Sequence, residues 1–149
     1  MDAALRTRFS VEGQWALWRE HVIRWAECDI HGHVNNAAYL TLFEDMRIEW
    51  WLGAGGGFAP EKPGPVVGSL EVKYHRPGHF RDQVLLCVRA ASFRRTSFVH
   101  QYAMWRAGGL LCSARALCVV IDTATRQKAE IPEEMRRLMA ERDGAVAEI

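Results

Sequence analysis

A short polar stretch, residues 29 to 36, holds the side chains best suited to chemistry. Asp29, His31 and His33 occupy alternate positions, and Asn35 and Asn36 follow. A carboxylate can act as a general base or as a nucleophile, and a nearby histidine can orient it or move a proton. An aspartate in a loop can also simply close an Asx-turn on backbone amides. Spacing alone favours the turn.

An apolar helical pattern follows this polar stretch directly. Its apolar residues recur at three- and four-residue spacing, which predicts a helix of roughly four to five turns carrying Tyr39, Leu40, Phe43, Met46 and Trp50 on one stripe. Asn35 or Asn36 is a suitable N-cap, and the glycines from 53 to 57 end the helix. Free amides and the helix dipole favour negative charge at such a start. Asp29 would therefore precede an electrophilic pocket.

Beyond the glycines the apolar residues alternate, which predicts strands. The alternating segments are 70–75, 84–90, 98–104 and 112–120, and a first strand at 21–27 precedes the helix. Short turn-like connections between the later segments predict antiparallel pairing. A short amphipathic helix is expected at 132–142, and the extended connection 53–65 is a candidate flap over the pocket. The pattern is typical of an α+β domain, and several helix-on-sheet folds fit it.

The segment from Trp25 to Glu49 resembles the hotdog-fold acyl-CoA thioesterases of the 4-hydroxybenzoyl-CoA thioesterase family. The matching motifs are Glu27-Cys28-Asp29, Gly32-His33-Val34, Asn35-Asn36 and Tyr39-Leu40. The form GHVNNxxYL is also similar to acyl-carrier-protein thioesterases on the same fold. From Val66 to Ile121 the resemblance is looser and rests on strand order and on Tyr74-His75-Arg76-Pro77.

This resemblance implies a hotdog fold over residues 1–149, in which a curved antiparallel sheet of about five strands wraps one long central helix. It also implies an enzyme that hydrolyses an acyl-CoA thioester to a free acid and coenzyme A without a cofactor. In such an enzyme Asp29 would activate water or attack the carbonyl itself, and the backbone amide of Asn36 would stabilise the oxyanion. Gly32 would allow the chain to approach the acyl group closely.

Further residues are candidates for positioning or binding the substrate. His33 stands where acyl-carrier-protein thioesterases carry a histidine and could orient the carboxylate or the carbonyl, although a structural loop histidine fits equally well. His31 and Tyr39 are candidates for substrate contacts. Arg94 and Arg95 form a basic turn that could bind the phosphates of coenzyme A, whereas exposed arginines in turns are usually only solvated.

Several alternatives remain open. A hotdog hydratase or dehydratase would use His31 or His33 as its base, and a non-catalytic acyl-binding protein could share the fold. A metal bound by Asp29, His31 and His33 is not expected, because no partner motif follows. Cys28 adjoins the candidate site, but packing is a commoner role for such a cysteine than nucleophilic attack.

Composition is compatible with a compact enzyme. The chain has 149 residues and a formal net charge of +1, so no global field favours a nucleic acid or a membrane surface as partner. No signal-peptide core or membrane-length apolar run is present, which favours a cytoplasmic location and reduced cysteines. The expected partner is a small acyl-CoA molecule. Apolar residues on both faces of some strands, among them Ala103, Trp105 and Leu111, predict a homodimer or homotetramer.

Overall fold

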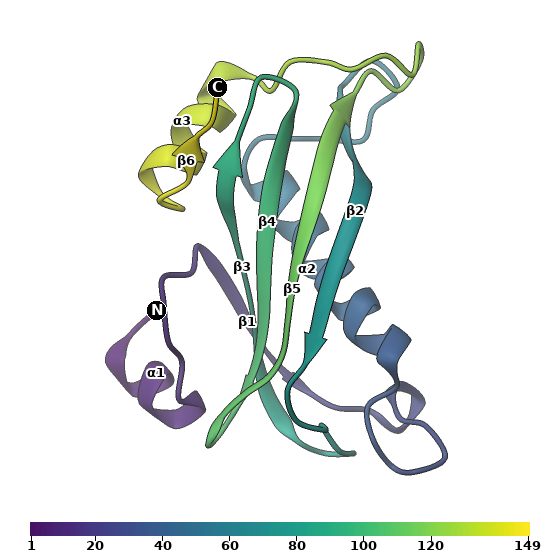
Figure 1. Cartoon of the computed structure of the whole chain (residues 1–149), viewed down its shortest axis with the longest axis vertical. Coiled ribbons are helices and arrows are strands. Elements are labelled where there is room, and N and C mark those ends of the chain that lie inside the picture. The colour runs from purple at the N-terminus through teal and green to yellow at the C-terminus, as the bar shows by residue number, and fades with distance from the viewer.

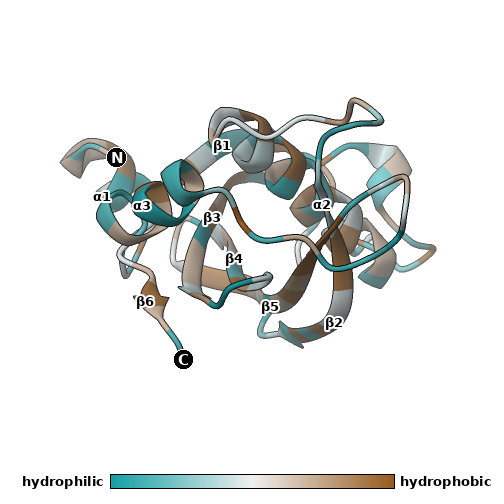
Figure 2. Ribbon diagram, turned by 90° about the horizontal axis from the view of Figure 1, so that it is seen from above, coloured by the Kyte–Doolittle hydropathy of each residue, from teal (hydrophilic) through white to brown (hydrophobic).

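One antiparallel sheet curving around a central helix organises the molecule, and the computed structural model describes residues 1–149. The elements are α1 (Ala3–Phe9), β1 (Leu17–Val22), the 3-10 turn η1 (Trp25–Glu27), α2 (Asn36–Gly53), β2 (Gly64–Tyr74), β3 (Gln83–Phe93), β4 (Ser97–Arg106), β5 (Gly109–Ile121), α3 (Glu133–Glu141) and β6 (Val146–Ala147). The strand order is β1-β3-β4-β5-β2, and β6 pairs in parallel with β3. Figures 1 and 2 show α2 lying within the curve of the sheet.

The central helix α2 begins where the sequence predicts. The side chain of Asn35 accepts a hydrogen bond from the amide of Ala37 at 2.8 Å and caps the helix. Its buried residues are Tyr39, Leu42, Phe43, Met46, Trp50 and Trp51. Leu40, which the sequence pattern placed on the apolar stripe, is only half-buried. The curved sheet covers a wider face of the helix than a single stripe.

The main core lies between α2 and the concave face of the sheet. Strand β3 contributes Val84, Leu86 and Val88, which are fully buried there. Aromatic rings join the helix to β4, because Phe43 stacks on Tyr102 at a centroid distance of 5.2 Å. These contacts fix the helix and hence its N-terminus relative to the strand ends.

The convex face of the sheet is partly covered by the N-terminal segment. Phe9 of α1 and the following Val11 pack in one buried cluster with Leu85, Cys87, Ala103 and Trp105. The expectation that a second subunit must cover Ala103 and Trp105 was therefore wrong. Leu111 was also misplaced: the β4–β5 pairing shifts register between Met104 and Trp105, and Leu111 lies in the main core.

The segment expected as the first strand, 21–27, is divided between two elements. Strand β1 ends at Val22, and η1 occupies Trp25–Glu27. The carboxylate of Glu27 accepts a hydrogen bond from the amide of Arg24 at 2.8 Å, which closes a turn and competes with strand pairing. The alternation of apolar residues gave no sign of this side-chain contact.

Strand β2 forms one edge of the sheet and is largely exposed. Exposed apolar side chains on it are Val66, Val67, Leu70 and Tyr74. The connection 54–63 between α2 and β2 lies at the end of the molecule opposite the 28–35 loop, so it does not cover the candidate pocket within one chain (Figure 1). None of the helices is both long and apolar enough to cross a membrane.

Candidate functional site

The loop before α2 is closed by the side chain of Asp29. Its Oδ1 atom accepts hydrogen bonds from the amides of His31 at 2.9 Å and His33 at 3.2 Å. Gly32 has a φ of +73°, a conformation that glycine adopts without strain, and no protein atom lies within 4 Å of where its Cβ would stand. The Asx-turn is thus present. The second oxygen, Oδ2, makes no hydrogen bond within the chain and remains available for chemistry.

The first turn of α2 provides a free backbone donor. Asn35 accepts from the amide of Ala37 through its side chain at 2.8 Å and from the amide of Ala38 through its carbonyl at 2.9 Å. The amide of Asn36 has no hydrogen-bond partner within the chain. It lies at the positive end of the helix dipole, so it is suited to bind an oxyanion.

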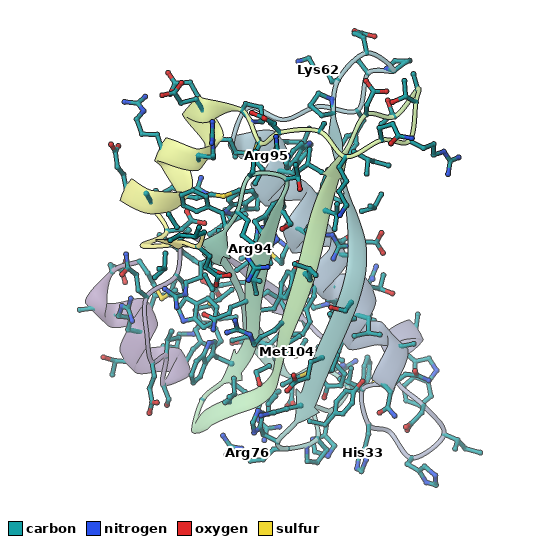
Figure 3. All side chains as sticks on the ribbon, turned by 45° about the horizontal axis from the view of Figure 1, so that its top comes forward. His33, Lys62, Arg76, Arg94, Arg95 and Met104 are labelled. Carbon is teal, nitrogen blue, oxygen red and sulfur yellow. The ribbon has the colours of Figure 1, made fainter.

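A cavity of about 250 Å³ brings the carboxylate and this helix start together. It lies between the start of α2 and the end of β2 and is lined by Asp29, His33, Val34, Asn36, Tyr39, Tyr74, His75, Arg76 and Pro77. In Figure 3, His33 and Arg76 lie at the same end of the molecule. An acyl carbonyl in this cavity could contact both a base and an oxyanion donor.

Two tyrosines in the cavity wall tie the helix to the strand end. The hydroxyl of Tyr39 accepts a hydrogen bond from the amide of Gly78 at 3.2 Å, and the hydroxyl of Tyr74 donates to the carbonyl of Asn36 at 3.2 Å. Burial raises the pKa of Tyr39, although the Gly78 amide opposes the shift. Tyr39 is therefore neutral at physiological pH and serves as a fixed wall.

Close packing at Gly78 leads to a stability prediction. A Cβ at this position would lie 2.9 Å from Cγ2 of Val34 and 3.4 Å from the hydroxyl of Tyr39. Gly78→Ala should therefore lower the free energy of unfolding by about 1–3 kcal/mol in a urea titration. Gly53→Ala is the matched control, because no atom lies within 4 Å of its Cβ position and its φ is ordinary. An unchanged midpoint for Gly78→Ala would contradict the close packing.

The histidines around the cavity form contacts that the sequence did not reveal. The ring of His33 meets the ring of His79 edge to face, with centroids 5.0 Å apart. The amide of His79 donates to Asp82 at 2.8 Å, and Arg106 pairs with the same carboxylate at 2.6 Å. The sequence spacing did not predict that His79 lies near the cavity, because it is placed there by an antiparallel bridge with His33, which is distant in sequence. His75 and Arg76, by contrast, belong to a motif already noted in the sequence.

The predicted site residues fall into three groups. Asp29, His33, Asn36 and Tyr39 line the cavity. His31 and Gly32 belong to the same loop but do not line it. Arg94 and Arg95 lie in the β3–β4 turn toward the other end of the molecule and pair with Glu148 and Glu130, each at 3.0 Å (Figure 3).

Cys28 does not contribute to the cavity. Its thiol donates to the carbonyl of Arg24 at 3.6 Å, and burial, followed by the charges of Glu27 and Asp29, raises its pKa. A raised pKa disfavours the nucleophilic thiolate. No group of three or more His, Cys, Asp or Glu side chains is arranged to hold a metal ion.

Solved structures share this fold. A thioesterase superfamily protein from Jannaschia sp. CCS1 is 25% identical, covers 99% of this chain and 96% of its own, and has a TM-score of 0.90. A thioesterase from Thermus thermophilus, complexed with coenzyme A and Zn, is 25% identical over 89% of this chain and 98% of its own, with a TM-score of 0.74. A 1,4-dihydroxy-2-naphthoyl-CoA thioesterase from Synechocystis is 18% identical over 87% and 97% of the two chains, with a TM-score of 0.75. The hotdog fold expected from the sequence is confirmed.

Sequence comparison gives a family as well as a fold. No curated protein matches the chain. The family model described as the thioesterase-like superfamily matches residues 23–139, which include the Asp29 loop, α2 and the strands β2 to β5. The chain belongs to the thioesterase-like superfamily.

Proposed function

We propose that this protein is an acyl-CoA thioesterase that hydrolyses an acyl-CoA thioester to a free acid and coenzyme A. The observation that carries this proposal is the shared cavity, lined both by Asp29 with its free oxygen and by Asn36 with its unpaired amide. A thioester carbonyl is an activated electrophile, so a carboxylate and an oxyanion donor can suffice. The family membership supports hydrolysis.

In the proposed reaction Asp29 acts as a general base. Its Oδ2 takes a proton from water while the water oxygen bonds to the carbonyl carbon. The amide of Asn36 donates to the resulting oxyanion. The carbon–sulfur bond then breaks, and the departing thiolate of coenzyme A receives the proton from Asp29. Direct attack by the carboxylate, which forms an anhydride that water then hydrolyses, uses the same groups.

Within the superfamily we assign the chain to the 4-hydroxybenzoyl-CoA thioesterase family. The motifs from Glu27 to Leu40 support this assignment. The first leads into the Asx-turn, and the last lies near the start of α2. Acyl-carrier-protein thioesters belong in any substrate panel because His33-Val34-Asn35-Asn36 resembles their thioesterases.

A hydratase is the second candidate, because His33 lines the cavity. Incubation with a panel of saturated and enoyl acyl-CoAs separates the functions. A thioesterase releases free thiol from the thioesters, a hydratase changes the enoyl absorbance without releasing thiol, and an acyl-binding protein does neither. Thiol release supports the proposal, and either of the other outcomes contradicts it.

We also propose that two subunits complete each site. Strand β2 leaves an exposed edge beside the cavity, and a second copy of the same strand would satisfy its free backbone groups. A twofold axis across this edge would set the cavity end of one chain beside the far end of the other, toward which Arg94 and Arg95 lie (Figure 3). The arginines would then reach the substrate from the partner, as a dimer or within a tetramer.

Replacing Arg94 and Arg95 together with alanine tests their proposed contact with the coenzyme A phosphates. The KM for acyl-CoA should rise by about tenfold or more with little change in kcat, because the phosphates are bound equally in the ground and transition states. Acyl-pantetheine, which lacks the nucleotide, should be nearly unaffected. Steady-state kinetics on both substrates check this, and equal losses on the two would exclude the contact.

A further inference from the structure

Glu27, at the end of η1, is a buried carboxylate that the proposed reaction does not use. It is only 6% exposed. Its Oε2 accepts hydrogen bonds from the backbone amide of Arg24 at 2.8 Å and meets Nε2 of His21 at 2.8 Å. Its Oε1 accepts from Nε and Nη2 of Arg24 at 3.0 and 2.6 Å. We call these three residues the Glu27 clamp.

The clamp keeps Glu27 charged. Burial raises the pKa of the carboxyl, but the hydrogen bonds from the amide and side chain of Arg24 and from His21 outweigh it, so the pKa falls below its ordinary value of 4.5. The clamp therefore stabilises the folded state above pH 4.5, and this contribution is lost as the pH falls through the lower folded pKa. Only the carboxylate of this ion pair is buried, because the Arg24 side chain is 69% exposed.

The backbone of Glu27 connects the clamp to the catalytic groups. Its carbonyl accepts a hydrogen bond from the amide of Asn35 at 2.8 Å, and Asn35 caps α2. Cys28 pairs with Val34 in an antiparallel bridge directly beyond it. The hydrogen bond between Glu27 and Asn35 thus joins the two ends of the loop that carries Asp29. Asn35 is the residue directly before Asn36, whose amide is unpaired.

We infer that Glu27 is a positioning residue that sets Asp29 and the Asn36 amide at the correct separation. His21 belongs to β1 and Arg24 precedes η1, so the clamp fixes the base of the loop to the edge of the sheet. A carboxylate is required because Arg24 presents a donor to each of its oxygens, the backbone amide to Oε2 and the guanidinium group to Oε1. This inference rests on the proposed function, since it names the groups that are positioned.

Glu27→Gln tests the clamp with a side chain of the same size. At either oxygen position the new NH2 group must face a donor of Arg24, so at least one contact is lost and the loop base loosens. We expect kcat to fall by about tenfold or more while KM for acyl-pantetheine stays within about twofold, because misplacement affects the transition state more than substrate binding. A lower kcat with a nearly unchanged KM supports a positioning role, and an unchanged kcat contradicts it.

Asp143→Asn is the matched control. Asp143 is fully buried and accepts hydrogen bonds from Nε1 of Trp50 at 2.8 Å and from the amide of Ala90 at 2.7 Å. It anchors the chain after α3 and does not line the cavity. The variant should be less stable than Glu27→Gln but should retain kcat well below its unfolding temperature. An equal loss of kcat in both variants would mean general destabilisation and would overturn the inference.

Hydrogen exchange provides a readout that does not depend on catalysis. The amides of Asp29, Val34 and Asn35 are hydrogen-bonded at 2.8 Å in the loop and at its end. They should exchange faster in Glu27→Gln and be unchanged in Asp143→Asn. Unchanged exchange in Glu27→Gln would refute the clamp. If the wild type hydrolysed no thioester but this exchange pattern appeared, the proposed function would fail while the structural link held.

Discussion

Replacing Asp29 with asparagine is expected to lower kcat for acyl-CoA hydrolysis by about a hundredfold or more. Asparagine can neither take a proton from water nor attack the carbonyl. Its side-chain oxygen can still accept the amides of His31 and His33, so the Asx-turn and the fold should survive. Thiol release at saturating substrate, together with circular dichroism of the purified variant, measures both effects.

Asp45→Asn is the control for this variant. Asp45 is an exposed carboxylate on α2 that meets Arg19 only loosely, at 3.7 Å, and does not line the cavity. It should retain full activity. Near wild-type turnover by Asp29→Asn would show that Asp29 serves only to close the turn. The same result would leave the cavity without its proposed base.

Introducing a charge on the exposed face of β2 is expected to dissociate the enzyme and remove most of its activity. Leu70 is 41% exposed on this edge strand. Leu70→Asp should leave a folded monomer, because much of the side chain already faces solvent, but it should place two carboxylates in the proposed subunit contact. We expect activity to fall by about tenfold or more because each site needs both subunits. Sedimentation at micromolar concentration gives the mass.

Val22→Asp provides the comparison for the edge-strand variant. Val22 is 52% exposed and lies on β1, at the opposite edge of the sheet. This variant should keep both the native mass and the activity. The wild-type mass should correspond to two or four chains. A fully active wild-type monomer would exclude the proposed contact and the shared site together.

The sequence predicted the fold where periodicity alone decides the structure. Alternation placed segments within the observed bounds of β3, β4 and β5, and helical spacing with Asn35 or Asn36 as the cap located α2. Prediction from periodicity failed where a side-chain hydrogen bond or a short element determines the local structure. Glu27 turns the chain after β1 by binding the amide of Arg24, and α1 is too short to show a helical period. Because α1 and the residues after it cover Ala103 and Trp105, these two side chains no longer support the prediction of a second subunit.

The candidate site was predicted in part for a similar reason. Asp29, His33 and Asn36 are close in sequence, so a motif can place them together around one helix start. His79 and the Glu27 clamp depend on contacts between the loop, β1 and the chain before β3, which no spacing reveals. The nearest sign of the clamp was the first acidic residue of the Glu27-Cys28-Asp29 motif, whose role only the hydrogen bonds define.

The central claim is that the Asp29 carboxylate and the Asn36 amide hydrolyse an acyl-CoA thioester in one cavity. The most direct measurement quantifies free coenzyme A and free acid together, in parallel reactions of the wild type and Asp29→Asn with the same panel of acyl-CoAs. The account predicts equimolar acid and thiol from the wild type on at least one substrate and about a hundredfold less of both from the variant. Absence of both products across the panel, or equal rates from the two proteins, would contradict it.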